Sequence, residues 1–203
     1  MLKKHLNMVL LVTMGLLITV PTLHAEVVTD GTVGPGGTIA GPNYDINETF
    51  GTLSGSNLFH SFTTININTG ETATFSWPAA AGSNNIVGRV TGGTFSNIDG
   101  SINSTVSGAN LWLVNPNGVV FGSNASINVL GSFHASTAEN IKFDDGTEFG
   151  TSVVSNPVLS VANPEGFGFV SVNPASTVGN NSNLSVANVE TLSLVAGEIT
   201  LFK

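Results

Sequence analysis

Two histidines, one arginine and a short acidic run are the residues whose types could support catalysis or metal binding. His60 and His134 could donate or accept protons near neutral pH. Arg89 could stabilise a developing negative charge, and the run from Asp144 to Glu148 could offer carboxylate ligands to calcium. Together such groups would suit an enzyme that cleaves acidic polysaccharides, in which a cation stabilises a carbanion.

The surroundings of these residues argue against an enzyme. Each histidine lies among Phe and Ser residues without an evident catalytic partner, which favours a structural, hydrogen-bonded role. Arg89 is the only arginine of the chain, so no second guanidinium is available for an acidic sugar. The acidic run lacks the spacing of a known calcium loop and is typical of a solvated turn. We therefore predict no catalytic residue, no metal site and no cofactor.

Arg89 lies in the segment Gly88-Arg89-Val90-Thr91-Gly92-Gly93, where glycines on both sides would let another backbone pass closely. Two roles for Arg89 stay open. It could donate hydrogen bonds to carbonyl groups at a corner of the chain, or it could contact a partner protein.

The first 25 residues are typical of a cleavable export signal. Lys3 and Lys4 precede an apolar run from Met8 to Val20, and a small residue, Ala25, lies near the expected cleavage point. The run is shorter than the roughly 20 residues that span a bilayer, so we predict no membrane segment after cleavage. Residues 26–203 then form one mature domain.

Composition excludes a nucleic-acid-binding protein. The formal net charge of the chain is −8, and two of its five basic residues lie in the predicted signal. Only 9% of the residues are charged, so Asn, Ser, Thr and Gly must supply most of the polar surface, which suits strands and turns. The absence of cysteine is compatible with a chain that crosses a second membrane unfolded, although a core of this size also needs no disulfides.

Short apolar alternations separated by Gly and Asn predict an almost wholly β protein. An antiparallel sandwich and a parallel solenoid both fit this pattern, and weak repeats favour the solenoid. Ser101-Ile102-Asn103 returns as Ser126-Ile127-Asn128, and the segment beginning at Asn115-Pro116 returns at Asn163-Pro164, both consistent with about two dozen residues per coil. We expect about seven stacked coils. The predicted strands are 62–67, 73–75, 86–90, 111–114, 119–121, 127–129, 153–154, 159–161, 167–172, 184–186, 192–195 and 199–201.

An open solenoid exposes unpaired strand edges, so its first coil needs a cover. The less repetitive stretch Thr38–Phe75 is the predicted amino-terminal β cap. Within the coils we expect an inward-facing apolar set: Leu111, Leu113, Val119, Phe121, Ile127 and Val129.

A tight turn separates two of the apolar strands. Pro116 presets φ for the first corner, while Asn117 and Gly118 tolerate positive φ, so Asn115-Pro116-Asn117-Gly118 can reverse the chain between Leu111–Val114 and Val119–Phe121. Alone, this turn is ordinary.

The turn becomes informative when it is considered together with three other segments of the chain. Gly55–Phe62 and Asn85–Gly93 precede the turn, and Gly131–Ala138 follows it. In this order the segments resemble the amino-terminal secretion domain of filamentous-haemagglutinin-like exoproteins of two-partner secretion, over about residues 38–201. Val119 replaces the isoleucine usual in the turn motif. A second motif of the family, Asn-Pro-Asn-Leu, is present only in the degenerate form Asn156-Pro157-Val158-Leu159.

The resemblance implies a right-handed parallel β-helix and a specific partner. That partner is an outer-membrane β-barrel transporter whose POTRA repeats would recognise the chain in the periplasm of a Gram-negative envelope. The protein would then be secreted or displayed at the cell surface, and Arg89 becomes a candidate contact to the transporter. Family members usually continue into a long passenger, which we expect to be absent here.

Two other functions remain open on the sequence. One is an adhesin or matrix protein that binds host or matrix carbohydrate. The other, less favoured because of the lone arginine and the missing acid pairs, is a β-helical enzyme that degrades polysaccharides.

Overall fold

The computed structural model describes residues 26–77, 84–153, 156–170, 177–180, 182 and 184–201. The predicted signal, residues 1–25, lies outside the described residues. The described chain is β throughout, apart from one 3-10 turn, η1 (Glu48–Phe50). Its strands are β1 (Val27–Thr29), β2 (Gly37–Ile39), β3 (Asn43–Asn47), β4 (Thr52–Ser54), β5 (Asn57–Ile65), β6 (Thr72–Ser76), β7 (Asn85–Val90), β8 (Ser96–Ile98), β9 (Ser101–Ser104), β10 (Asn110–Val114), β11 (Val119–Phe121), β12 (Ser126–Asn128), β13 (Phe133–Ser136), β14 (Asn140–Phe143), β15 (Glu148–Gly150), β16 (Pro164–Gly168), β17 (Thr177–Asn180), β18 (Leu192–Val195) and β19 (Glu198–Leu201).

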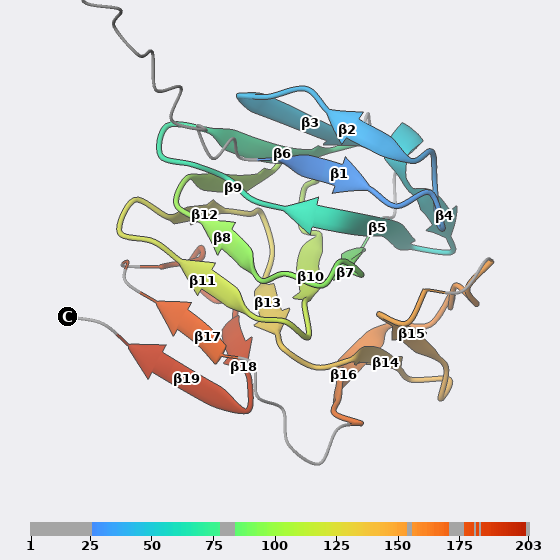
Figure 1. The fold of residues 1–203 in the computed structure, drawn as a ribbon. Coiled ribbons are helices and arrows are strands. Elements are labelled where there is room, and N and C mark those ends of the chain that lie inside the picture. The colour runs from blue at the N-terminus through green and yellow to red at the C-terminus, as the bar shows by residue number, and fades with distance from the viewer. Residues whose placement is uncertain are drawn as a thin grey trace, which may run out of the picture.

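Three parallel stacks of strands form the faces of a β-helix (Figure 1). The first sheet stacks β5, β7, β10, β13 and β18, the second stacks β8, β11, β17 and β19, and the third stacks β3, β6, β9 and β12. Successive coils visit the three sheets in turn, as in β7–β8–β9 followed by β10–β11–β12. The predicted parallel solenoid is confirmed, and the sandwich is excluded. The right-handed sense of its turn stays a prediction.

One of the two sequence repeats marks the coil and the other does not. Ser101 pairs with Ser126 and Ile102 with Ile127 in adjacent parallel strands, so this repeat is one coil in length. The other repeat begins at Asn115, and its first copy continues into β11, where Val119 pairs with Val178 of β17. The second copy, at Pro164–Gly168, pairs antiparallel with β14, so the similarity between these two segments does not reflect stacking.

Antiparallel strands cover the amino-terminal end of the coils, as predicted, but earlier in the chain. β1 and β4 pair antiparallel with β5, and β2 pairs antiparallel with β1. The predicted cap boundaries, Thr38–Phe75, were wrong because β5 and β6 within them already belong to the parallel stacks. The cover consists of β1, β2 and β4, and it closes the edge of the first sheet that the first coil would expose. β3, which lies between β2 and β4 in sequence, belongs to the third parallel stack.

After β13 the chain leaves the stack and forms a three-stranded antiparallel sheet, β15-β14-β16, which we term the side sheet. Figure 1 shows it beside the coils, while β17 and β19 return to the stack. The predicted series of about seven uninterrupted coils was therefore wrong: the first sheet stacks five strands among the described residues. The predicted strands at 159–161 and 184–186 are irregular, and the one predicted at 167–172 is β16, which begins earlier and ends at Gly168.

The apolar residues form two cores. The inner cluster fills the coils and contains all six side chains predicted to point inward. The outer cluster lies between the first sheet and the side sheet: Val33, Phe59, Val87, Trp112, Val114, Ile141, Phe143 and Phe149. The strands β5, β7 and β10 of the first sheet are thus buried on both faces, so burial along them is nearly continuous and does not alternate.

Candidate functional site

The predicted turn motif forms the corner between β10 and β11. The Gly118 amide donates to the Asn115 carbonyl (3.0 Å), and the Asn117 amide donates to Asn115 Oδ1 (2.9 Å). Gly118 has a φ of +118°, whereas Asn117 does not have positive φ. Of the two residues that tolerate positive φ, only Gly118 adopts it, while Asn115 Oδ1 stabilises the turn at Asn117.

The two asparagine side chains of this corner bind the preceding coil. Asn115 Nδ2 donates to the Thr94 carbonyl (3.1 Å) and to Ser96 Oγ (3.0 Å), and Asn117 Nδ2 donates to the Gly92 carbonyl (2.8 Å). On the opposite side, the Asn115 amide donates to the Ser136 carbonyl of the following coil (2.9 Å). The motif therefore joins three successive coils through hydrogen bonds.

Little of this corner is exposed in the folded chain. Asn115 and Gly118 are buried, Pro116 is half-buried and Asn117 is exposed. A buried amide side chain needs its hydrogen bonds satisfied, and the Asn115 Nδ2 group has its acceptors only when the preceding coil is in place. The hydrogen bonds of the corner can therefore fix the position of one coil relative to the next.

The degenerate motif lies on a different element. Asn156-Pro157-Val158-Leu159 belongs to the segment between β15 and β16, and Asn156 adopts a φ of +60°. Val158 is 68% exposed, whereas Leu159 packs against the outer cluster and its carbonyl accepts from Ser54 Oγ (2.8 Å). The segment holds the side sheet against the amino-terminal cap.

Arg89 lies inside the molecule, with 1% of its surface exposed. Its Nε donates to Ser61 Oγ (2.7 Å), one terminal nitrogen donates to Thr32 Oγ1 (2.8 Å), and the other donates to the Gly150 carbonyl. Its Cζ lies 4.4 Å from the centroid of the Phe149 ring. The guanidinium thereby joins the cap, the coils and the side sheet, which is the structural role that the sequence left open.

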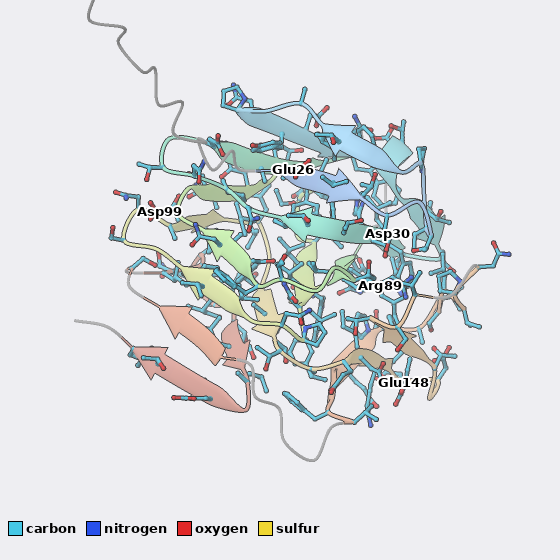
Figure 2. All side chains as sticks on the ribbon, in the orientation of Figure 1. Glu26, Asp30, Arg89, Asp99 and Glu148 are labelled. Atoms are coloured by element: carbon cyan, nitrogen blue, oxygen red, sulfur yellow. The ribbon has the colours of Figure 1, made fainter. Side chains whose placement is uncertain are left out.

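A carboxylate compensates this buried cation. Burial tends to raise the pKa of Asp30, but hydrogen bonds from Ser61, Thr32 and Thr91 lower it overall. Burial lowers the pKa of Arg89, and the charge of Asp30 opposes that shift. In Figure 2, Asp30 and Arg89 lie close together on the side of the coils that faces the side sheet. The pair remains ionised and bridged by Ser61, because the hydroxyl donates to Asp30 Oδ2 (2.6 Å).

Neither histidine has the environment of a catalytic base. His60 is fully buried between Phe62 and Phe75, and its ring nitrogens have no hydrogen-bond partner among the described residues. Burial lowers its pKa to about 4, with a weak opposing effect from the nearby Phe50 carbonyl, whose geometry falls short of a hydrogen bond. His60 is structural, as expected, but the predicted hydrogen bond is absent. His134 stacks on Trp112 with 3.9 Å between ring centroids, and burial lowers its pKa.

The acidic run forms a turn at the tip of the side sheet, with no metal-binding geometry. Asp145 Oδ1 accepts from the Thr147 amide (2.9 Å), and Gly146 has a φ of +79°. Ser160 Oγ donates to the second oxygen of Asp145 (2.7 Å). Across the described ranges, no group of three or more His, Asp or Glu side chains is arranged to hold a metal ion.

An asparagine ladder was missed by the sequence analysis. Asn85 Nδ2 donates to Asn57 Oδ1 (2.9 Å), and Asn110 Nδ2 donates to Asn85 Oδ1 (3.2 Å). Asn57 Nδ2 in turn donates to the Ser160 (3.0 Å) and Ala162 (2.6 Å) carbonyls of the side-sheet segment. The available signal was that each of the strands β5, β7 and β10 begins with asparagine.

The comparison with known families identifies the family of this chain. The sequence model of the family described as the TPS secretion domain matches residues 25–203. The chain belongs to this family of secretion domains. It is accordingly the secretion domain of a two-partner-secretion exoprotein.

A solved secretion domain has the same fold. The chain is similar to the HMW1 secretion domain from Haemophilus influenzae, with a TM-score of 0.52 and 19% sequence identity. The match covers 88% of this chain but 39% of the HMW1 chain, so this TPS domain spans well under half of that structure's length. No curated protein sequence matches the chain significantly.

Membership in a secretion family points to export and not to catalysis. Within the described residues of this TPS domain, no helix combines the length and the apolar character of a membrane span. Roles in secretion stay predictions for the motif corner at Asn115–Gly118 and for the degenerate segment at Asn156–Leu159. The geometry of both segments describes only the folded domain, not its transport.

Proposed function

We propose that this TPS domain is recognised before it folds by the POTRA repeats of its outer-membrane β-barrel transporter, and that it folds as a β-helix at the cell surface. One observation carries the proposal. β10, which leads into the motif corner, lies in the middle of the first sheet, where β7 and β13 pair with both of its edges. A receptor strand could add to this segment only before these pairs form.

Burial of the side chains supports the same order of events. Leu111 and Val114 are fully buried, and Leu113 is 2% exposed. In the folded protein, the motif presents chiefly Asn117 to solvent. Recognition of the unfolded segment by the transporter, followed by its burial in the fold, would make the interaction transient and export directional.

Folding outside the cell supplies a driving force without nucleotide hydrolysis. Each completed coil offers a strand edge and polar anchors to the next, as Ser96 and Thr94 do for Asn115. Backward movement through the barrel would require those hydrogen bonds and the apolar contacts of the inner cluster to break. The predicted signal at residues 1–25 would deliver the chain to the periplasm, and residues 26–203 would be the mature domain.

Arg89 contributes to this function in the folded state as a structural group. Its hydrogen bonds to Ser61, Thr32 and Gly150 form only when cap, coils and side sheet are assembled. A contact of Arg89 with the transporter stays a prediction for the chain before folding. The full engagement of its guanidinium also weighs against the enzyme alternative, because no other arginine exists to bind an acidic sugar.

The proposal is tested by separating recognition from folding. A synthetic peptide spanning residues 105–122 should bind purified POTRA repeats of the transporter, and the same peptide carrying Asn115→Ala and Asn117→Ala should bind more weakly. A peptide spanning residues 158–170 contains the similar sequence Asn163-Pro164-Glu165-Gly166 and is the matched control, which should not bind.

The full-length chain provides the second arm. When co-expressed with the transporter, the Asn115→Ala variant should accumulate in the periplasm, while Asn163→Ala should reach the medium like the unmodified chain. Circular dichroism of each purified variant checks that it still folds. Normal secretion of Asn115→Ala, together with no binding of the motif peptide, would remove the motif from the recognition step.

A further inference from the structure

A ladder of outward-facing side chains crosses the first sheet, one from each stacked strand. The paired positions run from Phe59 through Val87, Trp112 and His134 to Ser193. The side sheet covers the first three, which belong to the outer cluster. Phe167 of β16 marks the end of this cover, with its ring centroid 5.3 Å from that of Trp112.

The ladder ends in an uncovered ring. One face of the His134 imidazole stacks on Trp112 at an interplanar angle of 19°. The next position on the other side is Ser193, whose side chain is too small to cover an imidazole. A cavity of about 400 Å³ lies there, with Glu165 and Phe167 on the β16 side and Thr191 and Ser193 on the β18 side. We term it the His134 pocket.

The charge of the His134 pocket selects the kind of ligand. Glu165 is exposed and is the only charged residue among the described residues that line the pocket. Burial lowers the pKa of His134, so the imidazole is uncharged at neutral pH and does not repel a cation. The chain as a whole carries a formal charge of −8. An anionic ligand would therefore meet no compensating charge, whereas a cation would meet a carboxylate.

We propose that the His134 pocket binds the guanidinium group of an arginine side chain on a partner polypeptide. A guanidinium is planar and stacks on aromatic faces, so it would extend the ladder on the free face of His134. Its paired N–H groups match the two oxygens of a carboxylate such as Glu165. An ammonium ion lacks the flat face, and a neutral sugar lacks the charge that Glu165 would pair with.

Residues 1–203 hold no arginine that could fill the pocket. Arg89 is the only arginine of this chain, and it is buried with its donors directed to Ser61, Thr32 and Gly150. The pocket forms only in the folded state, because its two sides come from the side sheet and from β18. It therefore concerns a partner that meets the folded domain and is independent of recognition before folding.

Trp112 reports directly on binding. The chain has two tryptophans, so a Trp77→Phe background leaves Trp112 as the single emitter beneath His134. N-acetyl-arginine amide should change its fluorescence in a saturable manner, with an apparent Kd in the millimolar range that is typical of one side chain. The uncharged analogue N-acetyl-citrulline amide, the lysine analogue and methyl glucoside should bind at least about threefold more weakly.

Variants of the pocket test its two halves. Glu165→Gln should weaken binding of the arginine probe by about threefold or more, and Ser193→Tyr should abolish it by filling the space above His134. Glu198→Gln, which removes an exposed carboxylate outside the pocket, is the matched control and should bind normally. Circular dichroism checks the fold of each variant. No saturable response to the arginine probe, equal binding of any of the three comparison compounds, or an unchanged affinity in Glu165→Gln would overturn the proposal.

Discussion

The guanidinium carbon of Arg89 lies 4.4 Å from the centroid of the Phe149 ring, so a cation on a central strand of the coils is closed off by the side sheet. The same guanidinium donates to the Gly150 carbonyl beside that ring and to Thr32 in the amino-terminal cap. Three parts of the fold therefore meet at one buried side chain.

Removing this cation should destabilise the whole domain. In Arg89→Met, Asp30 loses its buried counter-charge and the Gly150 carbonyl loses its donor, so the free energy of unfolding should fall by about 3 kcal/mol in urea denaturation. Lys142→Met is the control, because the ion pair of Lys142 with Glu148 (3.6 Å) is half-exposed and should contribute less than about 1 kcal/mol. Equal stability of the two variants would show that Arg89 does not join the three parts.

His60 should make stability depend on pH below neutrality. Burial lowers its pKa from 6.5 to about 4, so the unfolded chain binds a proton between these values that the folded chain does not. The contribution of His60 to the free energy of unfolding is therefore fully present above pH 6.5. It falls by about 3 kcal/mol as the pH drops toward 4.

The test compares urea unfolding at pH 7 and pH 4.5 for the unmodified chain and for His60→Leu. In His60→Leu, the free energy of unfolding should fall much less between these pH values, because the leucine side chain does not titrate. An unchanged decline would assign the pH dependence to the carboxylates instead.

Gly92 and Gly93 are neighbours in sequence, but replacement by alanine should destabilise the domain only at Gly92. A Cβ at Gly92 would lie 2.1 Å from the Thr63 carbonyl oxygen, whereas a Cβ at Gly93 meets nothing within 4 Å. Gly92→Ala should lower the free energy of unfolding by roughly 1–3 kcal/mol, because backbone must shift, and should also disturb the Asn117 bond to the Gly92 carbonyl. Gly93→Ala should unfold at nearly the same urea concentration as the unmodified chain. Equal effects would contradict the close approach at Gly92.

Transport of an unfolded chain predicts sensitivity to a single crosslink. Ser101 and Ser126 face each other on adjacent coils with 2.8 Å between their Oγ atoms, and the chain has no cysteine of its own. A Ser101→Cys, Ser126→Cys variant can form a disulfide in the periplasm, because that compartment is oxidising and the two cysteines can meet in the chain before it folds. The closed loop should then block secretion, and the chain should accumulate behind the outer membrane.

Each single cysteine variant is the control and should be secreted normally. Addition of a reductant to the culture should restore export of the double variant, as measured by the protein in the medium. Efficient secretion of the oxidised double variant would show that the transporter passes folded coils.

The side sheet and its contacts could not be predicted from the sequence. Arg89 and Gly150 are 61 positions apart, and no local spacing indicates that their groups meet. The look-alike turn at Asn163-Pro164 suggested another coil corner, yet β16 pairs antiparallel with β14. Short-range alternation identifies a strand but not its neighbour, because parallel and antiparallel partners bury the same apolar faces.

The sequence by itself determined the β character, the tight corner at Asn115–Gly118 and the length of one coil, since these depend on alternation, turn chemistry and a local repeat. Only the tertiary structure decided that Arg89 is buried, that His134 ends a stack of rings and that β13 is followed by a departure from the coils. The physical reason is that burial and pairing depend on segments distant in sequence, which become neighbours only when the coils and the side sheet close on one another.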